Sequence, residues 1–182
     1  EDTAVALLSQ DNEKVKVPRD VISISKFVSS VLEDLNGSEE EIEIPILNTK
    51  AAVLQKVVRF CSQYCQDPMK SIPAPVPFGH PLKEYIQEWY ADFLEEIATS
   101  DLFDLAAAAN FLDIPPLLEL TCSAIGLLVM NKTPAEIREM LGVEEEFSPE
   151  LEEELLMKNR WSTQPACQSL LPKAKHDAGD WR

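Results

Sequence analysis

The stretch at residues 101–129, DLFDLAAAANFLDIPPLLELTCSAIGLLV, decides how the rest of the chain can be arranged. It contains two apolar blocks separated by a hinge at residues 113–116. In the first block, apolar residues recur at steps of three and four, and the alanines between them favour helix. Pro115 disfavours helix at Ile114 and is expected to end the first block, while Pro116 suits the first turn of a second helix.

The second apolar block presents two stripes at helical spacing. One stripe consists of Leu118, Cys122, Ile125 and Val129. The stripe beside it consists of Leu117, Thr121, Ala124 and Leu128. A helix that is apolar all round is buried on several sides, and this one is too short and interrupted to span a bilayer. The hairpin is therefore either an ordinary core element or an element shared between the chain's own core and a partner protein.

Length and charge limit the kinds of partner. The 182 residues can form one domain, with or without an extension. Acidic residues number 32 against 16 basic ones, which gives a net charge of −16. Because such a surface repels phosphate backbones and anionic lipids, we expect neither nucleic acid nor membrane as a partner. A basic protein surface fits better.

Residues that could carry catalysis or bind a metal are scarce. The two histidines belong to no metal-binding or nucleophile–base pattern, and the five glycines are isolated from one another. Cys61 and Cys65 lie one helical turn apart, but a second pair and a nearby histidine are missing. We expect these thiols to be buried rather than bound to zinc. We expect no catalytic residue, metal, cofactor or small-molecule substrate.

Cysteine usage points to a reducing compartment. The four cysteines show no spacing typical of a disulfide framework, and residues 1–9 show no secretory signal. We therefore expect an intracellular location.

The first part of the chain mixes strand and helix patterns. Residues 3–9 and 14–17 predict a β-hairpin. Residues 21–35 predict one short and one longer helix. Residues 42–46 alternate as a strand, and Pro45 favours an edge position in a sheet.

The middle of the chain predicts two helices separated by a loop. Asn48 or Thr49 is expected to cap the first helix, over residues 51–65. The segment 66–81 contains five prolines and is expected to lack regular structure. Helix resumes over residues 82–98, where large apolar residues recur every four positions.

Two short helices are expected after the apolar hairpin. Thr133 and Glu136 have the spacing of a capping box, and Pro134 falls at the first helical position. Ser148 and Pro149 begin a last helix in the same way.

The last helix and the residues after it differ in character. Leu151 and Leu155 are expected to face inward, and Trp161 lies just beyond the helix. Residues 162–182 have no periodicity and few large apolar residues, so we expect a disordered tail.

Several segments, taken in order, resemble the Skp family of adaptor proteins. They are IPILNTKAAVLQKVVRFC, LFDLAAAANFLDIPPLLELTCSAI, KTPAEIREMLGV and FSPELEEELLMKNRW. The resemblance covers about residues 3–161. It implies an α/β (α+β) fold, in which a BTB/POZ domain with a small sheet and helical core precedes a C-terminal helical extension.

The resemblance divides the chain into five parts. They are the N-terminal part of the BTB/POZ domain at 1–66, a proline-rich loop at 67–81, the remaining BTB helices at 82–130, the F-box-binding extension at 131–161 and the tail at 162–182.

Proteins of this family are non-catalytic adaptors of SCF (Skp–cullin–F-box) ubiquitin ligases. The resemblance implies that this chain joins a cullin to F-box proteins for ubiquitin-dependent degradation, in the cytoplasm and nucleus. It implies cullin binding by Asn110 and Phe111, where the family usually has tyrosine at the second position. Together with the surplus apolar stripe, it predicts an F-box-binding surface of Leu102, Phe103, Leu118, Cys122, Ile125, Val129, Ile137, Met140, Leu141, Val143, Leu151, Leu155 and Trp161.

Pro149 is a possible modification site by the same resemblance. Some protist family members carry a hydroxylated, sugar-modified proline at the matching position. Its place at a helix start is also explained by geometry alone.

Two alternative functions stay open. One is an adaptor of the elongin C type, although elongin C resembles only the BTB part and lacks helices such as those expected at 133–161. The other is a structural adaptor that binds F-box proteins without ligase activity.

Overall fold

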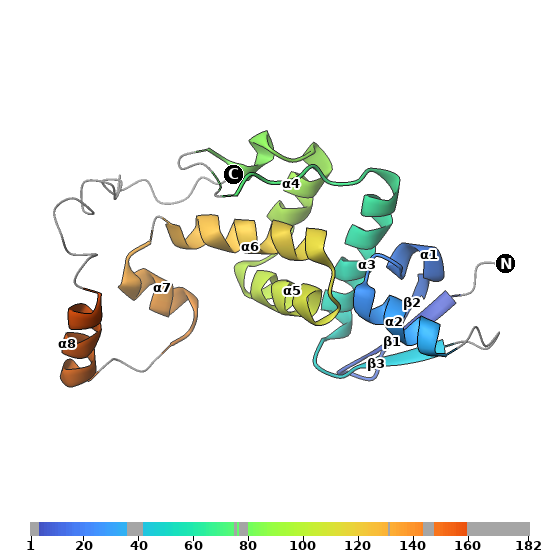
Figure 1. Cartoon of the computed structure of the whole chain (residues 1–182), viewed down its shortest axis with the longest axis horizontal. Coiled ribbons are helices and arrows are strands. Elements are labelled where there is room, and N and C mark those ends of the chain that lie inside the picture. Colours follow the sequence, from blue (N-terminus) through green and yellow to red (C-terminus); the bar gives the residue numbers. More distant parts are fainter. Residues whose placement is uncertain are drawn as a thin grey trace. The chain divides into compact units, whose positions relative to one another are not determined.

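The computed structural model describes residues 4–35, 42–74, 76, 80–130, 132–143 and 148–159. These residues belong to two compact units, of which the first ends at Leu127 and the second begins at Leu128. The first unit holds a small sheet and the helices labelled α1 to α6, and the second holds α7 and α8 (Figure 1). The last residues of α6 extend into the second unit.

A three-stranded sheet lies in the N-terminal part of the first unit. β1 (Ala4–Ser9) pairs antiparallel with β2 (Lys14–Pro18) and parallel with β3 (Ile42–Ile46). The strand order β2-β1-β3 leaves β3 at an edge, where a proline such as Pro45 is tolerated. The predicted hairpin, the third strand and its edge position are confirmed.

One face of the sheet packs against helices. Alternate strand residues are buried on this face, among them Val5, Leu7, Val17 and Ile44. The helices α1 (Arg19–Ile22) and α3 (Ala51–Gln66) contact the sheet and each other, and α2 (Lys26–Asp34) follows α1. The predicted pair of one short and one longer helix is thereby confirmed.

The start of α3 differs from the prediction. Its N-cap position is Lys50, and neither Asn48 nor Thr49 caps the helix. Instead, the side chain of Asp11, in the β1–β2 turn, accepts a hydrogen bond of 2.9 Å from the Ala51 N–H. A distant residue thus satisfies one of the free N–H groups at the helix start, and a local sequence pattern does not reveal such a contact.

The two thiols of α3 have different surroundings. Cys61 is buried in the core, and burial raises its pKa to about 12. Cys65 is exposed, because the last turn of α3 extends past the core. The expectation of buried thiols is therefore correct for Cys61 and wrong for Cys65.

The proline-rich segment after α3 lacks regular structure over residues 67–74, yet it packs against the rest of the first unit. Met69 and Ile72 are buried. The Tyr90 hydroxyl donates to the Asp67 carbonyl oxygen at 2.6 Å. The Ile72 N–H donates to the Glu119 carboxylate at 3.0 Å.

The helix predicted over residues 82–98 is interrupted. A single 3₁₀ turn, η1 (Leu82–Glu84), precedes α4 (Glu88–Glu95). Gln87 lies in the break, and its side-chain amide accepts from the Lys70 N–H at 3.0 Å and donates to the Pro68 carbonyl at 2.9 Å. These contacts with the preceding loop explain why the helix does not run continuously.

The apolar hairpin consists of α5 (Thr99–Phe111) and α6 (Pro115–Met130), as Figure 1 shows in yellow-green and yellow. As expected, α5 ends before the hinge at residues 113–116, and it does so in a Schellman motif. Asp113 has a left-handed φ of 47°, its N–H bonds the Asn110 carbonyl, and the Ile114 N–H bonds the Ala109 carbonyl. These backbone hydrogen bonds close the end of the helix, and Pro115, which disfavours helix at Ile114, acts in the same direction.

The second unit contains α7 (Pro134–Met140) and α8 (Pro149–Lys158). The predicted capping box is confirmed, since Thr133 and Glu136 each accept a backbone hydrogen bond from the other. Ser148 caps α8 by accepting from the Leu151 N–H at 3.3 Å. Gly142, with a φ of 64°, follows α7.

Candidate partner-binding surfaces

The first candidate surface lies at the end of α5. Asn110 is exposed, and 40% of Phe111 is accessible. The Phe111 ring packs against the ring of Phe27 on α2, with centroids 5.2 Å apart at an angle of 49°. Both residues predicted to bind a cullin are therefore available to a partner, and Phe111 is not a core residue.

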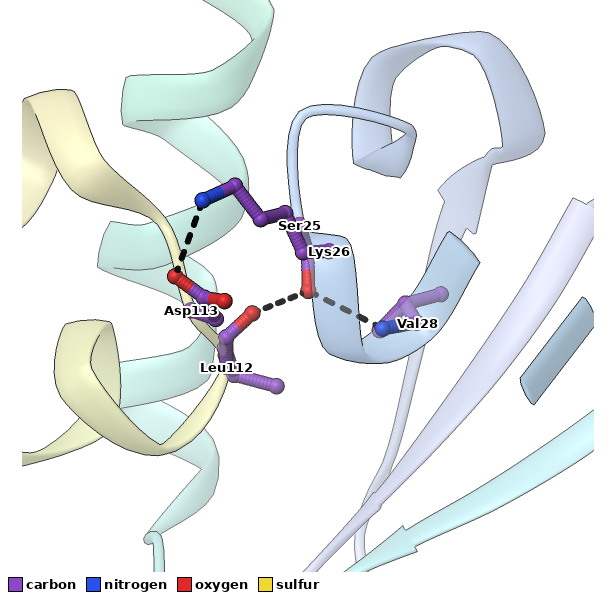
Figure 2. Close-up of polar contacts among 5 residues, drawn as sticks. All are labelled: Ser25, Lys26, Val28, Leu112 and Asp113. Carbon is purple, nitrogen blue, oxygen red and sulfur yellow. Dashed lines mark hydrogen bonds and ion pairs between the residues drawn. The ribbon is translucent and has the colours of Figure 1, made fainter. Parts of the chain in front are cut away.

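A buried hydrogen-bond network joins the start of α2 to the end of α5. The Ser25 hydroxyl donates to the Leu112 carbonyl and accepts from the Val28 N–H, as Figure 2 shows. The Lys26 N–H donates to the Asp113 carbonyl at 3.1 Å, and the Lys26 ammonium lies 3.7 Å from the Asp113 carboxylate. Because Ser25 is fully buried, its two hydrogen bonds are shielded from water, whereas the Lys26–Asp113 ion pair is exposed; the Ser25 bonds hold the two helix ends in register.

The second candidate surface is the outer face of α6. Leu117, Thr121 and Ala124 are buried and Leu128 is half-buried, so most of this stripe serves the chain's own core. The neighbouring stripe, which we call the open stripe, is half-buried or exposed and consists of Leu118, Cys122, Ile125 and Val129. At the exposed Gly126, within this face, an added Cβ would meet no atom within 4 Å.

The second unit also exposes apolar side chains. Leu141, Val143 and Leu151 are between 41% and 49% accessible. Ile137, Met140 and Leu155 are half-buried. Short helices with this much accessible apolar surface gain stability when a partner covers it.

Comparison with known proteins identifies the family of the chain. Residues 3–66 match the Skp1 family tetramerisation domain, and residues 115–162 match the Skp1 family dimerisation domain. An S-phase kinase-associated protein 1 homolog of Tetrahymena thermophila is 34% identical over 160 residues, which cover 88% of this chain and 94% of the relative. This chain belongs to the Skp1 family.

Other relatives show the same full-length similarity. A Skp1-related protein of Caenorhabditis elegans is 34% identical over 86% of this chain and 90% of its own length. An Aspergillus fumigatus protein named E3 ubiquitin ligase complex SCF subunit sconC is 33% identical over 88% of this chain and 98% of its own length. Membership of the Skp1 family agrees with the three-stranded sheet and mostly helical core.

Three residues predicted for the F-box-binding surface need separate comment in this Skp1-family chain. Leu102 is only 4% accessible, because it faces the core side of α5, and it is left out of the proposed surface. The prediction that Leu151 faces inward is wrong, because 41% of this residue is accessible. Trp161 lies outside the described residues, as does the tail at 162–182.

Sequence reasoning missed two residues at the α5 end. Phe27 falls within the residues 21–35 that predict helix, but the buried positions of α2 are Val28 and Leu32, and Phe27 is half-buried beside Phe111. Ser25 carried a detectable signal, because serine is a preferred N-cap residue and here caps α2. Its bond to Leu112 has no local signal.

The described ranges contain no cluster of three or more metal-ligating side chains. Within the same ranges, no helix is long and apolar enough to cross a membrane.

Proposed function

We propose that this chain is a non-catalytic adaptor of an SCF-type ubiquitin ligase, which binds a cullin through the end of α5 and an F-box protein through α6 and the second unit. The names of SCF subunits among its full-length relatives support the complex. The two candidate surfaces support a bridging role, since they lie on different elements. In this role the chain acts in the cytoplasm and nucleus.

The observation that carries the F-box assignment is the open stripe of α6. The residues of the buried stripe face the chain's own core, whereas each residue of the open stripe keeps apolar surface accessible to a partner. An amphipathic helix or a short helical motif of a partner buries such a face through contacts at helical spacing. We assign to the same partner the accessible Leu141, Val143 and Leu151 of the second unit. Phe103 and Trp161 are assigned to it from the family resemblance.

The proposed cullin surface rests on Asn110 and Phe111. A half-exposed aromatic ring beside an uncharged amide is typical of an interface anchor. The Ser25–Leu112 bond fixes the backbone that follows Phe111, so the ring is presented without a large ordering cost on binding.

Two variants, one on each surface, test this proposal. Asn110→Lys with Phe111→Lys places two charges at the α5 end and should abolish binding of a cullin N-terminal region while F-box binding survives. Gly126→Lys places a long charged side chain in the open stripe, where the chain itself has space, and should show the reverse pattern. Each variant controls for the folding of the other. Loss of both partners in both variants, or of neither, contradicts the proposal.

The two alternative functions give different results in the same binding assay. An elongin C-type adaptor would bind a cullin but not an F-box protein, and the match of residues 115–162 to the Skp1 family argues against it. A non-ligase structural adaptor would bind an F-box protein but not a cullin.

We also propose Pro149 as a hydroxylation site. It is exposed at the first position of α8, where an added hydroxyl would reach solvent. The mass of a peptide spanning residues 144–158 from the native source decides this, and an unmodified peptide rejects it.

A further inference from the structure

The contact between Phe27 and Phe111 joins two helices into one aromatic surface. Phe27 lies in the first turn of α2 and Phe111 is the last residue of α5. Their rings are in contact, yet Phe111 remains 40% accessible and Phe27 is half-buried. Neither ring is covered by the chain's own core, so the pair presents a continuous apolar surface from both helices.

The backbone beneath the pair is fixed by the hydrogen bonds of Ser25 and Lys26. Ser25 caps α2 and bonds the Leu112 carbonyl (Figure 2). The Lys26 N–H bonds the Asp113 carbonyl. Phe27 directly follows Lys26, and Phe111 directly precedes Leu112, so each aromatic residue is adjacent in sequence to a residue of this network. The spacing of the two rings is preorganised, which lowers the ordering cost of binding.

The charge around the pair differs from that of the whole chain. The first turn of α2 contains no acidic residue, and residues 108–111 of α5 are uncharged. The only charges in the network are Lys26 and Asp113, which lie 3.7 Å apart and offset each other. In a chain of net charge −16, this is a locally neutral apolar site, and it fits an apolar partner surface better than a basic one.

We propose that Phe27 contacts the cullin together with Phe111, so that the cullin surface extends from α5 onto α2. This inference rests on the proposed function, because the cullin is assigned as occupant through continuity with Asn110 and Phe111. The partner surface is expected to be an apolar patch wide enough to cover both rings.

Affinity measurements with substituted chains test whether Phe27 contributes to the free energy of cullin binding. Phe27→Glu should weaken binding of the cullin N-terminal region at least tenfold, and the milder Phe27→Ala should weaken it measurably, while F-box affinity changes less than twofold. Leu35→Glu is the matched control, because Leu35 is 46% accessible and follows the opposite end of α2 from the network. It should leave cullin affinity within twofold of the unsubstituted chain.

Alkylation of a cysteine at position 27 distinguishes direct contact of this residue with the cullin from a role in which Phe27 only supports Phe111. In a Phe27→Cys chain, cullin should protect residue 27 from alkylation, as measured by mass spectrometry, and an F-box protein should not. The inference fails, and the proposed function stands, if position 27 stays reactive in the cullin complex. The same holds if Phe27→Glu binds cullin normally while Asn110→Lys with Phe111→Lys does not.

If the unsubstituted chain does not bind cullin, the proposed function fails. If Phe27→Glu changes only self-association, a second copy is the occupant and the inference is overturned.

Discussion

The Ser25 hydroxyl donates a hydrogen bond to the backbone carbonyl of Leu112, 87 positions later in the chain. The same hydroxyl caps α2 by accepting from the Val28 N–H. One buried side chain therefore fixes both the start of α2 and the backbone that follows Phe111. The proposed cullin surface depends on this connection, because its two rings come from the two elements that Ser25 joins.

Ser25→Ala should lower the free energy of unfolding by about 2 kcal/mol, because it removes a helix cap and leaves a buried carbonyl unpaired. Urea unfolding measures this change. Ser29→Ala is the control, since the Ser29 hydroxyl bonds the Ser23 carbonyl at an exposed site, and its loss should cost less than about 0.5 kcal/mol. Equal effects of the two substitutions would show that Ser25 has no special role.

Asp113 holds a left-handed backbone conformation that β-branched residues adopt poorly. Asp113→Val should therefore destabilise the chain by about 1–2 kcal/mol, whereas Asp113→Gly should be neutral or slightly stabilising. Both variants lose the exposed ion pair with Lys26, so that loss cancels in the comparison between them. Thermal unfolding of the pair measures it, and identical midpoints would contradict the observed φ.

The two thiols of α3 should react at very different rates. Burial raises the pKa of Cys61 to about 12, so at pH 8 its reactive thiolate is scarce as well as inaccessible. Cys65 and Cys122 are exposed. Iodoacetamide at pH 8 should label these two in the native chain and should label Cys61 only after unfolding. Rapid native labelling of Cys61, read by peptide mass spectrometry, would show that the core opens more readily than the structure indicates.

Trp161→Ala should weaken F-box binding by about 2 kcal/mol or more, because tryptophan is among the residues that most often form interface hot spots. Titration calorimetry with an F-box protein measures the loss. Cullin affinity should stay unchanged and serves as the internal control. Unchanged F-box affinity would remove Trp161 from the proposed surface.

Local patterns in the sequence predicted the features that depend on neighbouring residues. Period-two alternation gave β3, and the spacing of Thr133 and Glu136 gave the capping box. The two stripes of α6 were also predicted, although periodicity alone does not indicate which of them is buried. The same limit explains Leu102, whose helical spacing fits either the core or a surface.

Features that depend on distant residues could not be predicted. The Asp11 side chain caps α3 from the β1–β2 turn. Gln87 lies between η1 and α4, and its side chain accepts a hydrogen bond from the preceding loop. The Ser25–Leu112 bond is of the same kind. Each is a polar contact between segments that become neighbours only once the core has formed, so the partner leaves no trace in the local pattern.

The most direct test of the bridging role is sedimentation of the purified chain with a cullin N-terminal region and an F-box protein together. We expect a 1:1:1 complex. Asn110→Lys with Phe111→Lys should reduce it to the pair of this chain with the F-box protein, and Gly126→Lys should reduce it to the pair with the cullin. Competition between the two partners for the unsubstituted chain, with only binary complexes at any concentration, would contradict the bridging role.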